Sequence, residues 1–188
     1  MALVPSDDDL LQRVAAGDRV ALDDLFRQYR VVAYRVAYRL LGNEADALDA
    51  VQDGFVNALN HLDKFRGQSS FKTWLMRVVS NASLDLGRRR KRQEARSGGQ
   101  SVTDDTPIAD DLPGPGAELE RADLRKQLTA ALAELPEAQR ATFVLHADGG
   151  LTYREVADVL GISIGTVMSR VFYARQRLKA LLADQVLP

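Results

Sequence analysis

The sequence contains no cysteine, which excludes a disulfide framework, a thiolate zinc site and a cysteine nucleophile. Its two histidines, His61 and His146, lie far apart without HExxH-like spacing, so each is interpreted as an ordinary helix-surface or core residue rather than a metal ligand. A P-loop and a nucleophile–base pair at a usable spacing are also missing. These absences argue against an enzyme, and we expect no catalytic residues, no metal and no cofactor.

Hydrophobic runs long enough to cross a membrane are missing as well. The most apolar stretch, RVVAYRVAYRLLG, is interrupted by Arg35 and Arg39. The N-terminal sequence MALVPSDDDLLQR has no basic region followed by an apolar run, so it does not resemble a secretory signal. With 188 residues, 46% of them hydrophobic and 27% charged, the composition is typical of a soluble globular protein. We expect no membrane insertion and a cytoplasmic location.

The formal net charge is only −1, but the charges are segregated along the chain. Residues 66–96 carry 9 basic and 2 acidic side chains, whereas residues 97–120 carry 6 acidic and no basic ones. Residues 121–188 carry 9 basic and 7 acidic side chains. Such segregation indicates that particular surfaces bind polyanions.

Apolar residues recur at helical spacing through most of the sequence, and no long alternating run predicts a strand. A first helix is predicted at about residues 22–40, ending at Gly42, and a second begins near Glu44. A third begins near Ser69 or Ser70, either of which is a suitable N-cap. The apolar face of the second helix is predicted to consist of Leu48, Val51, Phe55, Leu59 and Leu62. The predicted fold class is therefore all-α.

Two small helical domains are predicted on either side of a polar segment. The stretch SGGQSVTDDTPIADDLPGPG is rich in Ser, Gly, Pro and Asp, which is typical of a flexible acidic linker. Helical patterning resumes near Ala117 and continues to about Leu182, broken at LPEAQ and DGGLT. We therefore expect an N-terminal domain of residues 1–95, a linker of residues 96–116 and a C-terminal domain of residues 117–188.

The C-terminal sequence LTYREVADVLGISIGTVMSRVFYARQRLK predicts a helix-turn-helix. Thr152 and Ser163 can cap its two helices, and Gly161 suits the turn between them. In this motif the second helix enters the major groove of duplex DNA. The buried stripe of that helix is predicted to contain Ile164, Val167, Val171, Ala174, Leu178 and Leu181.

The opposite face of the second helix carries candidate DNA-binding residues. An exposed Phe172–Tyr173 pair is unfavourable in water but can contact thymine methyl groups and sugars, while neighbouring arginines bind phosphates. The alternative is an ordinary amphipathic hairpin with solvated arginines. The residues predicted to contact duplex DNA are Thr166, Met168, Ser169, Phe172, Tyr173, Arg175 and Gln176.

A second candidate nucleic-acid surface lies in FRGQSSFKTWLMRVVSNASLDLGRRRKR. One side of the predicted helix carries, at spacings of three, four and seven residues, Trp74, Arg77, Asn81 and Arg88. An aromatic ring, an amide and cations suit stacking and hydrogen bonding to unpaired bases. Two alternatives remain open: Trp74 is a core anchor with Asn81 as a local hydrogen-bond partner, and the basic run is a solvated helix end.

The preceding helix carries an acidic face formed by Asp46, Asp49 and Asp53. Such a face would repel DNA phosphates, so we expect it to dock on a basic protein partner. A solvated acidic face is the alternative.

Together these segments resemble bacterial sigma factors of the sigma-70 family, in particular the extracytoplasmic-function (ECF) group. ADALDAVQDGFVNAL and FRGQSSFKTWLMRVVSNASLD are similar to the family's second conserved region, and the sequence from LPEAQ to the closing helix is similar to its fourth. The resemblance implies a protein that binds core RNA polymerase, directs it to promoter DNA and helps to open that DNA. It also implies an anti-sigma factor as an inhibitory partner, which is the family's habit.

A helix-turn-helix repressor or activator with a helical sensor domain is the competing interpretation. A sensor domain needs neither the acidic face nor the aromatic, amide and basic face of the N-terminal half. The sigma-factor interpretation accounts for both.

The resemblance implies a role for each candidate residue. Residues that dock on core polymerase would be Asp46, Asp49, Gln52 and Asp53. Residues that bind the minus-ten element, including its unpaired non-template strand, would be Phe65, Arg66, Ser69, Ser70, Trp74, Arg77, Asn81 and Arg88. The closing helix would bind the minus-thirty-five duplex. Met168 and Tyr173 stand where many family members have basic residues, so the family's minus-thirty-five preference does not carry over directly.

Overall fold

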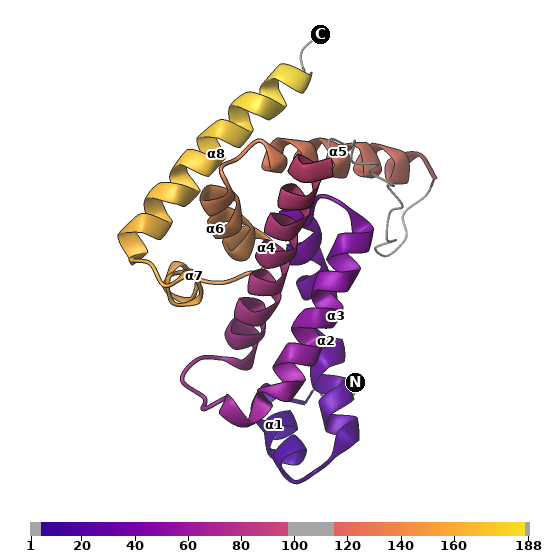
Figure 1. Ribbon diagram of the computed structural model, residues 1–188, viewed down its shortest axis with the longest axis vertical. Coiled ribbons are helices and arrows are strands. Elements are labelled where there is room, and N and C mark those ends of the chain that lie inside the picture. Colours follow the sequence, from indigo (N-terminus) through magenta and orange to yellow (C-terminus); the bar gives the residue numbers. More distant parts are fainter. Residues whose placement is uncertain (1–4, 98–114, 187–188) are drawn as a thin grey trace.

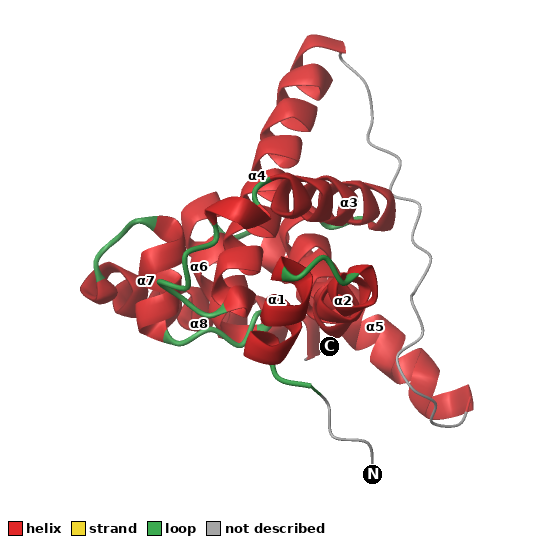
Figure 2. Cartoon of the chain, turned by 90° about the horizontal axis from the view of Figure 1, so that it is seen from below, coloured by secondary structure: helices red, strands yellow, loops and turns green. Residues whose placement is uncertain are grey.

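The computed structural model describes residues 5–97 and 115–186, and every regular element in these two ranges is a helix (Figure 2). The all-α prediction is therefore confirmed. Within the predicted linker, residues 98–114 lie outside the described residues. In chain order (Figure 1) the elements are α1 (Asp7–Ala15), α2 (Arg19–Leu41), α3 (Glu44–Asn60), the 3₁₀ helix η1 (Leu62–Lys64), α4 (Phe71–Ser97), α5 (Pro115–Ala133), α6 (Glu137–Ala147), α7 (Tyr153–Leu160) and α8 (Ile164–Val186).

Helices α2, α3 and α4 pack side by side in the N-terminal half, and α1 packs on α2 (Figure 1). Asp18 caps α2 by accepting from the backbone N–H groups of Val20 and Ala21. Gly42 ends this helix in the left-handed conformation, with φ 82°. In the core, the ring centroid of Phe71 on α4 lies 5.8 Å from that of Tyr29 on α2. This packing fixes α4, which carries four of the eight predicted minus-ten residues.

The predicted apolar face of α3 is confirmed only in part, because Val51, Phe55 and Leu62 pack against the core but Leu48 and Leu59 do not. Leu48 and Leu59 are 49% and 43% exposed, while the buried residues of the helix are Ala47, Ala50, Gly54 and Ala58. Small residues occupy this face because α3 and α4 approach closely. A Cβ atom added at Gly54 would lie 3.1 Å from the Cα atom of Val79. A pattern that counts large apolar side chains therefore misses the small residues that are most deeply buried.

Helix α1 is absent from the sequence prediction. Ser6 caps it by accepting from the backbone N–H of Asp9 at 3.2 Å, and three aspartates occupy its first turn. Its buried residue, Leu10, gives too little periodicity to predict a helix. The Tyr29 hydroxyl donates to Asp7, which ties α1 to α2. Burial and this carboxylate raise the pKa of Tyr29 well above its ordinary value.

Helices α5 to α8 form the C-terminal half, in which α8 packs on α5, α6 and α7. The core of this half includes Val144 and Leu145 from α6, Val156 from α7, and Val167 and Val171 from α8, all nearly inaccessible to solvent.

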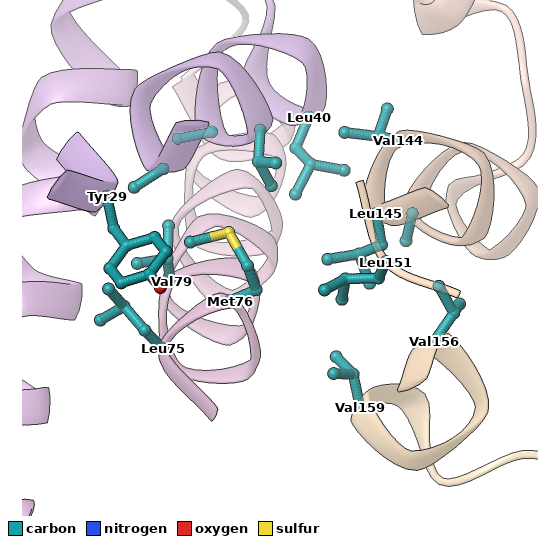
Figure 3. Packing of buried hydrophobic residues seen from close by; sticks show 14 of the residues in the cluster. Tyr29, Leu40, Leu75, Met76, Val79, Val144, Leu145, Leu151, Val156 and Val159 are labelled. Carbon is teal, nitrogen blue, oxygen red and sulfur yellow. The ribbon is translucent and has the colours of Figure 1, made fainter. Parts of the chain in front are cut away.

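The two halves also pack against each other. Helix α2 contacts α5 and α6, and α4 contacts α7. One hydrophobic cluster runs through both halves. Figure 3 shows Leu40 and Met76 of the N-terminal half facing residues of α6, α7 and the loop between them, among them Val144 and Leu151. The described chain is thus a single packed unit in which α4 lies beside the helix-turn-helix.

Candidate nucleic-acid and polymerase interfaces

Helices α7 and α8 form the predicted helix-turn-helix. The chain turns by 106° between them, and Gly161 supplies the left-handed turn residue with φ 65°. Thr152 and Glu155 form a capping box at the start of α7, and Ser163 accepts from the backbone N–H of Thr166 at 3.1 Å to cap α8. Hydrogen bonds from Thr73 and Thr152 outweigh burial and lower the pKa of Glu155. Both predicted caps are confirmed.

The outward face of α8 is apolar at its centre. Met168, Phe172 and Tyr173 are between 55% and 58% exposed, and the rings of Phe172 and Tyr173 meet edge to face at 5.5 Å. Ile164, which the prediction placed in the buried stripe, is 45% exposed. It stands in the first turn of α8, four residues before Met168 and so on the same side of the helix. It therefore extends the apolar face by one turn and could not be assigned from periodicity alone.

The polar members of the minus-thirty-five set surround this apolar face. Ser169, Arg175 and Gln176 are exposed, and Thr166 is half-buried. The hydroxyl of Ser169 donates to the backbone carbonyl of Thr166 at 3.0 Å, which holds it close to the helix. Sequence positions 161–183 contain no acidic residue. This face can therefore approach phosphates without charge repulsion.

Trp74 combines the two interpretations that the sequence left open. Its ring lies 5.4 Å from Phe65 and 5.7 Å from Phe71, between ring centroids, so it packs on the core. The residue is nevertheless only half-buried, and the loop before α4 lies beside it. Phe65 is half-buried in that loop and Arg66 is exposed. The ring of Trp74 is thus anchored on the core and remains partly accessible.

The start of α4 is capped by Ser70 rather than Ser69. Ser70 accepts from the backbone N–H of Thr73 at 3.1 Å. The hydroxyl of Ser69 donates only to the adjacent carbonyl of Ser70, at 3.4 Å. Gly67 takes φ 67° within the loop, a conformation that favours glycine.

The other members of the minus-ten set differ in their accessibility. Asn81 is exposed on α4. The guanidinium of Arg77 donates to the backbone carbonyl of Asp158 on α7 at 2.7 Å, and Arg88 pairs with Glu137 on α6 at 2.7 Å. In this arrangement two cations of the set are therefore bound to the C-terminal half.

The acidic face of α3 divides into exposed and paired residues. Asp49, Gln52 and Asp53 are exposed. Asp46 is half-buried, accepts from Asn43 and pairs with Arg90 of α4. Beside the exposed carboxylates, the apolar side chains of Leu48, Val56 and Leu59 are 43–49% exposed. Leu48 and Leu59 were predicted as part of the apolar face of the helix, and none of the three was predicted to contact polymerase.

Two family models match the chain, in the same order as the two halves. The Sigma-70 region 2 model matches residues 25–93, and the Sigma-70, region 4 model matches residues 125–178. These define a sigma factor of the sigma-70 type, the class that directs RNA polymerase to promoters.

The relatives give the narrower assignment. ECF RNA polymerase sigma factor SigE of Mycolicibacterium smegmatis is 37% identical over 184 residues, covering 95% of this chain and 70% of that protein. ECF sigma factor SigM of Mycobacterium tuberculosis is 37% identical over 177 residues, covering 94% of this chain and 85% of that protein. The chain belongs to the ECF RNA polymerase sigma factors.

Solved structures agree with this assignment. The structure of CnrH in complex with the cytosolic domain of CnrY has a TM-score of 0.71 and 30% identity, and covers 95% of this chain and 97% of that one. The sigma factor RpoE in complex with the anti-sigma factor NepR from Bartonella quintana has a TM-score of 0.68 and 27% identity, and covers 85% and 97%.

No single helix of the described residues has the length and hydropathy needed to span a membrane, and only α7 and α8 taken together across their bend reach those values.

Proposed function

We propose that this sigma factor uses three separate surfaces during initiation: α3 for core RNA polymerase, α4 and the loop before it for the unpaired minus-ten strand, and α8 for the minus-thirty-five duplex. The observation that carries the proposal is the outward face of α8. Large apolar side chains stand exposed there at the second helix of a helix-turn-helix, among basic residues and without an acidic one. Such a face suits the major groove of DNA.

The minus-thirty-five contacts come from the seven residues of α8 that the sequence predicted, Thr166, Met168, Ser169, Phe172, Tyr173, Arg175 and Gln176, all of them exposed or half-buried. Arg175 binds phosphate, and Ser169 and Gln176 hydrogen-bond to bases or the backbone. Thr166 lies at the entry of the helix, where recognition helices approach base edges. Met168, Phe172 and Tyr173 make the apolar contacts.

The minus-ten contacts come from the loop and one side of α4. Exposed Asn81 hydrogen-bonds to a base that has left the duplex, and the accessible part of the Trp74 ring stacks on a neighbouring base. Arg66, Arg77 and Arg88 bind phosphates of the same strand, while Phe65, Ser69 and Ser70 shape the loop. Trapping unpaired bases in this way promotes DNA opening.

Core polymerase docks on the exposed part of α3. Asp49, Gln52 and Asp53 supply a polar, acidic contact, and Leu48 and Val56 supply adjacent apolar area. Protein interfaces commonly combine an apolar centre with a charged rim. Asp46 acts less directly, since its pairing with Arg90 holds α3 against α4.

The proposal includes a cytoplasmic location, no enzymatic activity and regulation by an anti-sigma factor. RpoE, which this chain resembles over 85% of its length, was solved in complex with such a factor. We also propose the domain division at the linker, residues 96–116.

Transcription with purified core polymerase on sheared genomic DNA tests the function. Adding the protein should create new start sites that share upstream minus-ten and minus-thirty-five motifs. A helix-turn-helix repressor, the competing function, would create none. Identical start sites with and without the protein would refute the proposal.

A further inference from the structure

The two methionines in the described ranges differ completely in their access to solvent. Met76 lies in the core of the N-terminal half (Figure 3) and is 0% exposed, whereas Met168 on α8 is 55% exposed. The third methionine, Met1, lies outside the described residues. The sequence has no cysteine thiol that would compete for an oxidant. A mild oxidant should therefore modify Met168 while Met76 stays protected.

Met168 stands at the centre of the outward apolar face of α8. Ile164 lies four residues before it and Phe172 four residues after it, so the three share one side of the helix. Ile164 is 45% exposed and Phe172 is 56% exposed. Val167 and Val171, which hold the helix against the core, are buried. A chemical change at Met168 therefore alters the outward face and leaves the core packing of α8 intact.

Oxidation changes the polarity of this side chain and keeps its carbon skeleton. Hydrogen peroxide transfers one oxygen atom to the thioether sulfur: the O–O bond breaks, an S=O bond forms, and the other oxygen leaves as water. The sulfur loses two electrons, and the peroxide gains them. The product, methionine sulfoxide, is polar and chiral, whereas the thioether is apolar. An apolar contact group is thereby converted into one that carries a hydrogen-bond acceptor.

We propose that Met168 is a reversible oxidation site, and that its conversion to the sulfoxide by hydrogen peroxide weakens binding of the minus-thirty-five duplex. This proposal rests on the proposed function of α8. The reduced thioether supplies apolar area against thymine methyl groups. In the oxidised protein an S=O oxygen is buried at the same place without a hydrogen-bond donor, which is unfavourable. Methionine sulfoxide reductases, which take their electrons from a thiol, restore the thioether.

Binding of promoter DNA before and after peroxide treatment tests the proposal. The purified full chain is treated with hydrogen peroxide, freed of it and assembled with untreated core polymerase. Peptide mass spectrometry should show one added oxygen at Met168 and none at Met76. The affinity of the holoenzyme for a double-stranded fragment carrying the minus-thirty-five motif found by start-site mapping should fall on the order of tenfold. The circular dichroism spectrum of the oxidised protein should not change.

Two leucine variants separate Met168 from every other oxidisable residue. Met168→Leu removes the exposed sulfur, so its affinity, whatever its value before treatment, should be the same after peroxide. Met76→Leu is the matched control, because it removes the buried sulfur by a swap that cores tolerate. It should stay as sensitive to peroxide as wild type. Treatment of the oxidised wild-type protein with methionine sulfoxide reductases for both epimers should restore its affinity.

The outcomes separate this proposal from the function on which it rests. Complete oxidation of Met168 with unchanged affinity, while Phe172→Ala still weakens duplex binding, overturns the oxidation site and leaves the α8 surface standing. An equal loss of affinity in wild type and Met168→Leu, or a Met168 that peroxide does not modify, also overturns it. If neither Phe172→Ala nor Arg175→Ala alters duplex binding, the α8 surface is wrong, and the effect argued for Met168 is wrong with it.

Discussion

If α8 binds the minus-thirty-five duplex as proposed, single apolar side chains on it should distinguish promoter sequences in a way that charge cannot. Met168 and Phe172 have no hydrogen-bond donor, so they cannot recognise the polar edges of bases. The apolar group that a base pair presents in the major groove is the C5 methyl of thymine. With each of these side chains more than half exposed, the minus-thirty-five preference should depend on thymine methyl groups.

Replacing thymine by uracil in a minus-thirty-five duplex tests this residue-scale claim. Uracil lacks only the methyl group, and burial of one such group stabilises binding by about 0.8 kcal/mol. Wild-type protein should therefore bind roughly fourfold more weakly for each contacted thymine replaced. Phe172→Ala should lose part of this discrimination, whereas Arg175→Ala should bind both duplexes more weakly at an unchanged ratio. Equal binding of both duplexes by wild type would contradict the claim.

At the scale of helices, the sequence predicted where helices begin more accurately than it predicted which of their faces are buried. Ser70, Thr152 and Ser163 cap their helices as the sequence indicated, because a cap depends on atoms within three residues. The buried face of α3 depends instead on how closely α4 approaches, which no local pattern records. Leu48 and Leu59 were therefore placed on one apolar face with Val51 and Phe55, but they are exposed.

Gly54→Ala tests the close contact of α3 with α4. Alanine favours a helix over glycine by about 1 kcal/mol, but overpacking a core costs about 1–3 kcal/mol. The new Cβ would meet backbone of α4, which has little freedom to move, so the substitution should lower the free energy of unfolding. Gly165→Ala is the control, because its Cβ would meet only Ser163 Oγ at 3.9 Å. Urea denaturation should show opposite signs for the two variants, and stabilisation by Gly54→Ala would refute the packing argument.

Charge reversal on α3 tests the docking surface. Asp49→Lys combined with Asp53→Lys should abolish capture of core polymerase in a pull-down, because the acidic contact becomes basic. Both residues are exposed, so the circular dichroism spectrum should not change. Asp23→Lys with Asp63→Lys makes the same charge change at exposed positions outside α3 and should retain binding. Equal capture of both double variants would exclude this role for α3.

At the scale of the whole molecule, the sequence predicted two helical units but not their mutual packing. Arg39 illustrates the reason. In the sequence it interrupts an apolar stretch and argues against a membrane span, whereas in the fold it inserts between α5 and Asp148. Partners so distant along the chain leave no periodic signal near either residue. The individual contact residues of α4 and α8 could be proposed from spacing and resemblance. Only the fold shows which of these side chains are exposed and which are bonded to the C-terminal half.

The central claim is that α4 acts on unpaired minus-ten bases, whereas α8 acts on the closed minus-thirty-five duplex. Permanganate reactivity of minus-ten thymines in holoenzyme–promoter complexes tests this claim most directly. Reactivity is compared at equal amounts of bound promoter. Asn81→Ala should keep the bound complex but lower reactivity on the order of tenfold, because unstacking a base costs a few kcal/mol and one polar contact returns about 1–2 of it. Arg175→Ala should lower the amount bound and leave reactivity per complex unchanged. If Asn81→Ala instead reduces duplex binding and leaves reactivity per complex intact, α4 does not act on unpaired bases.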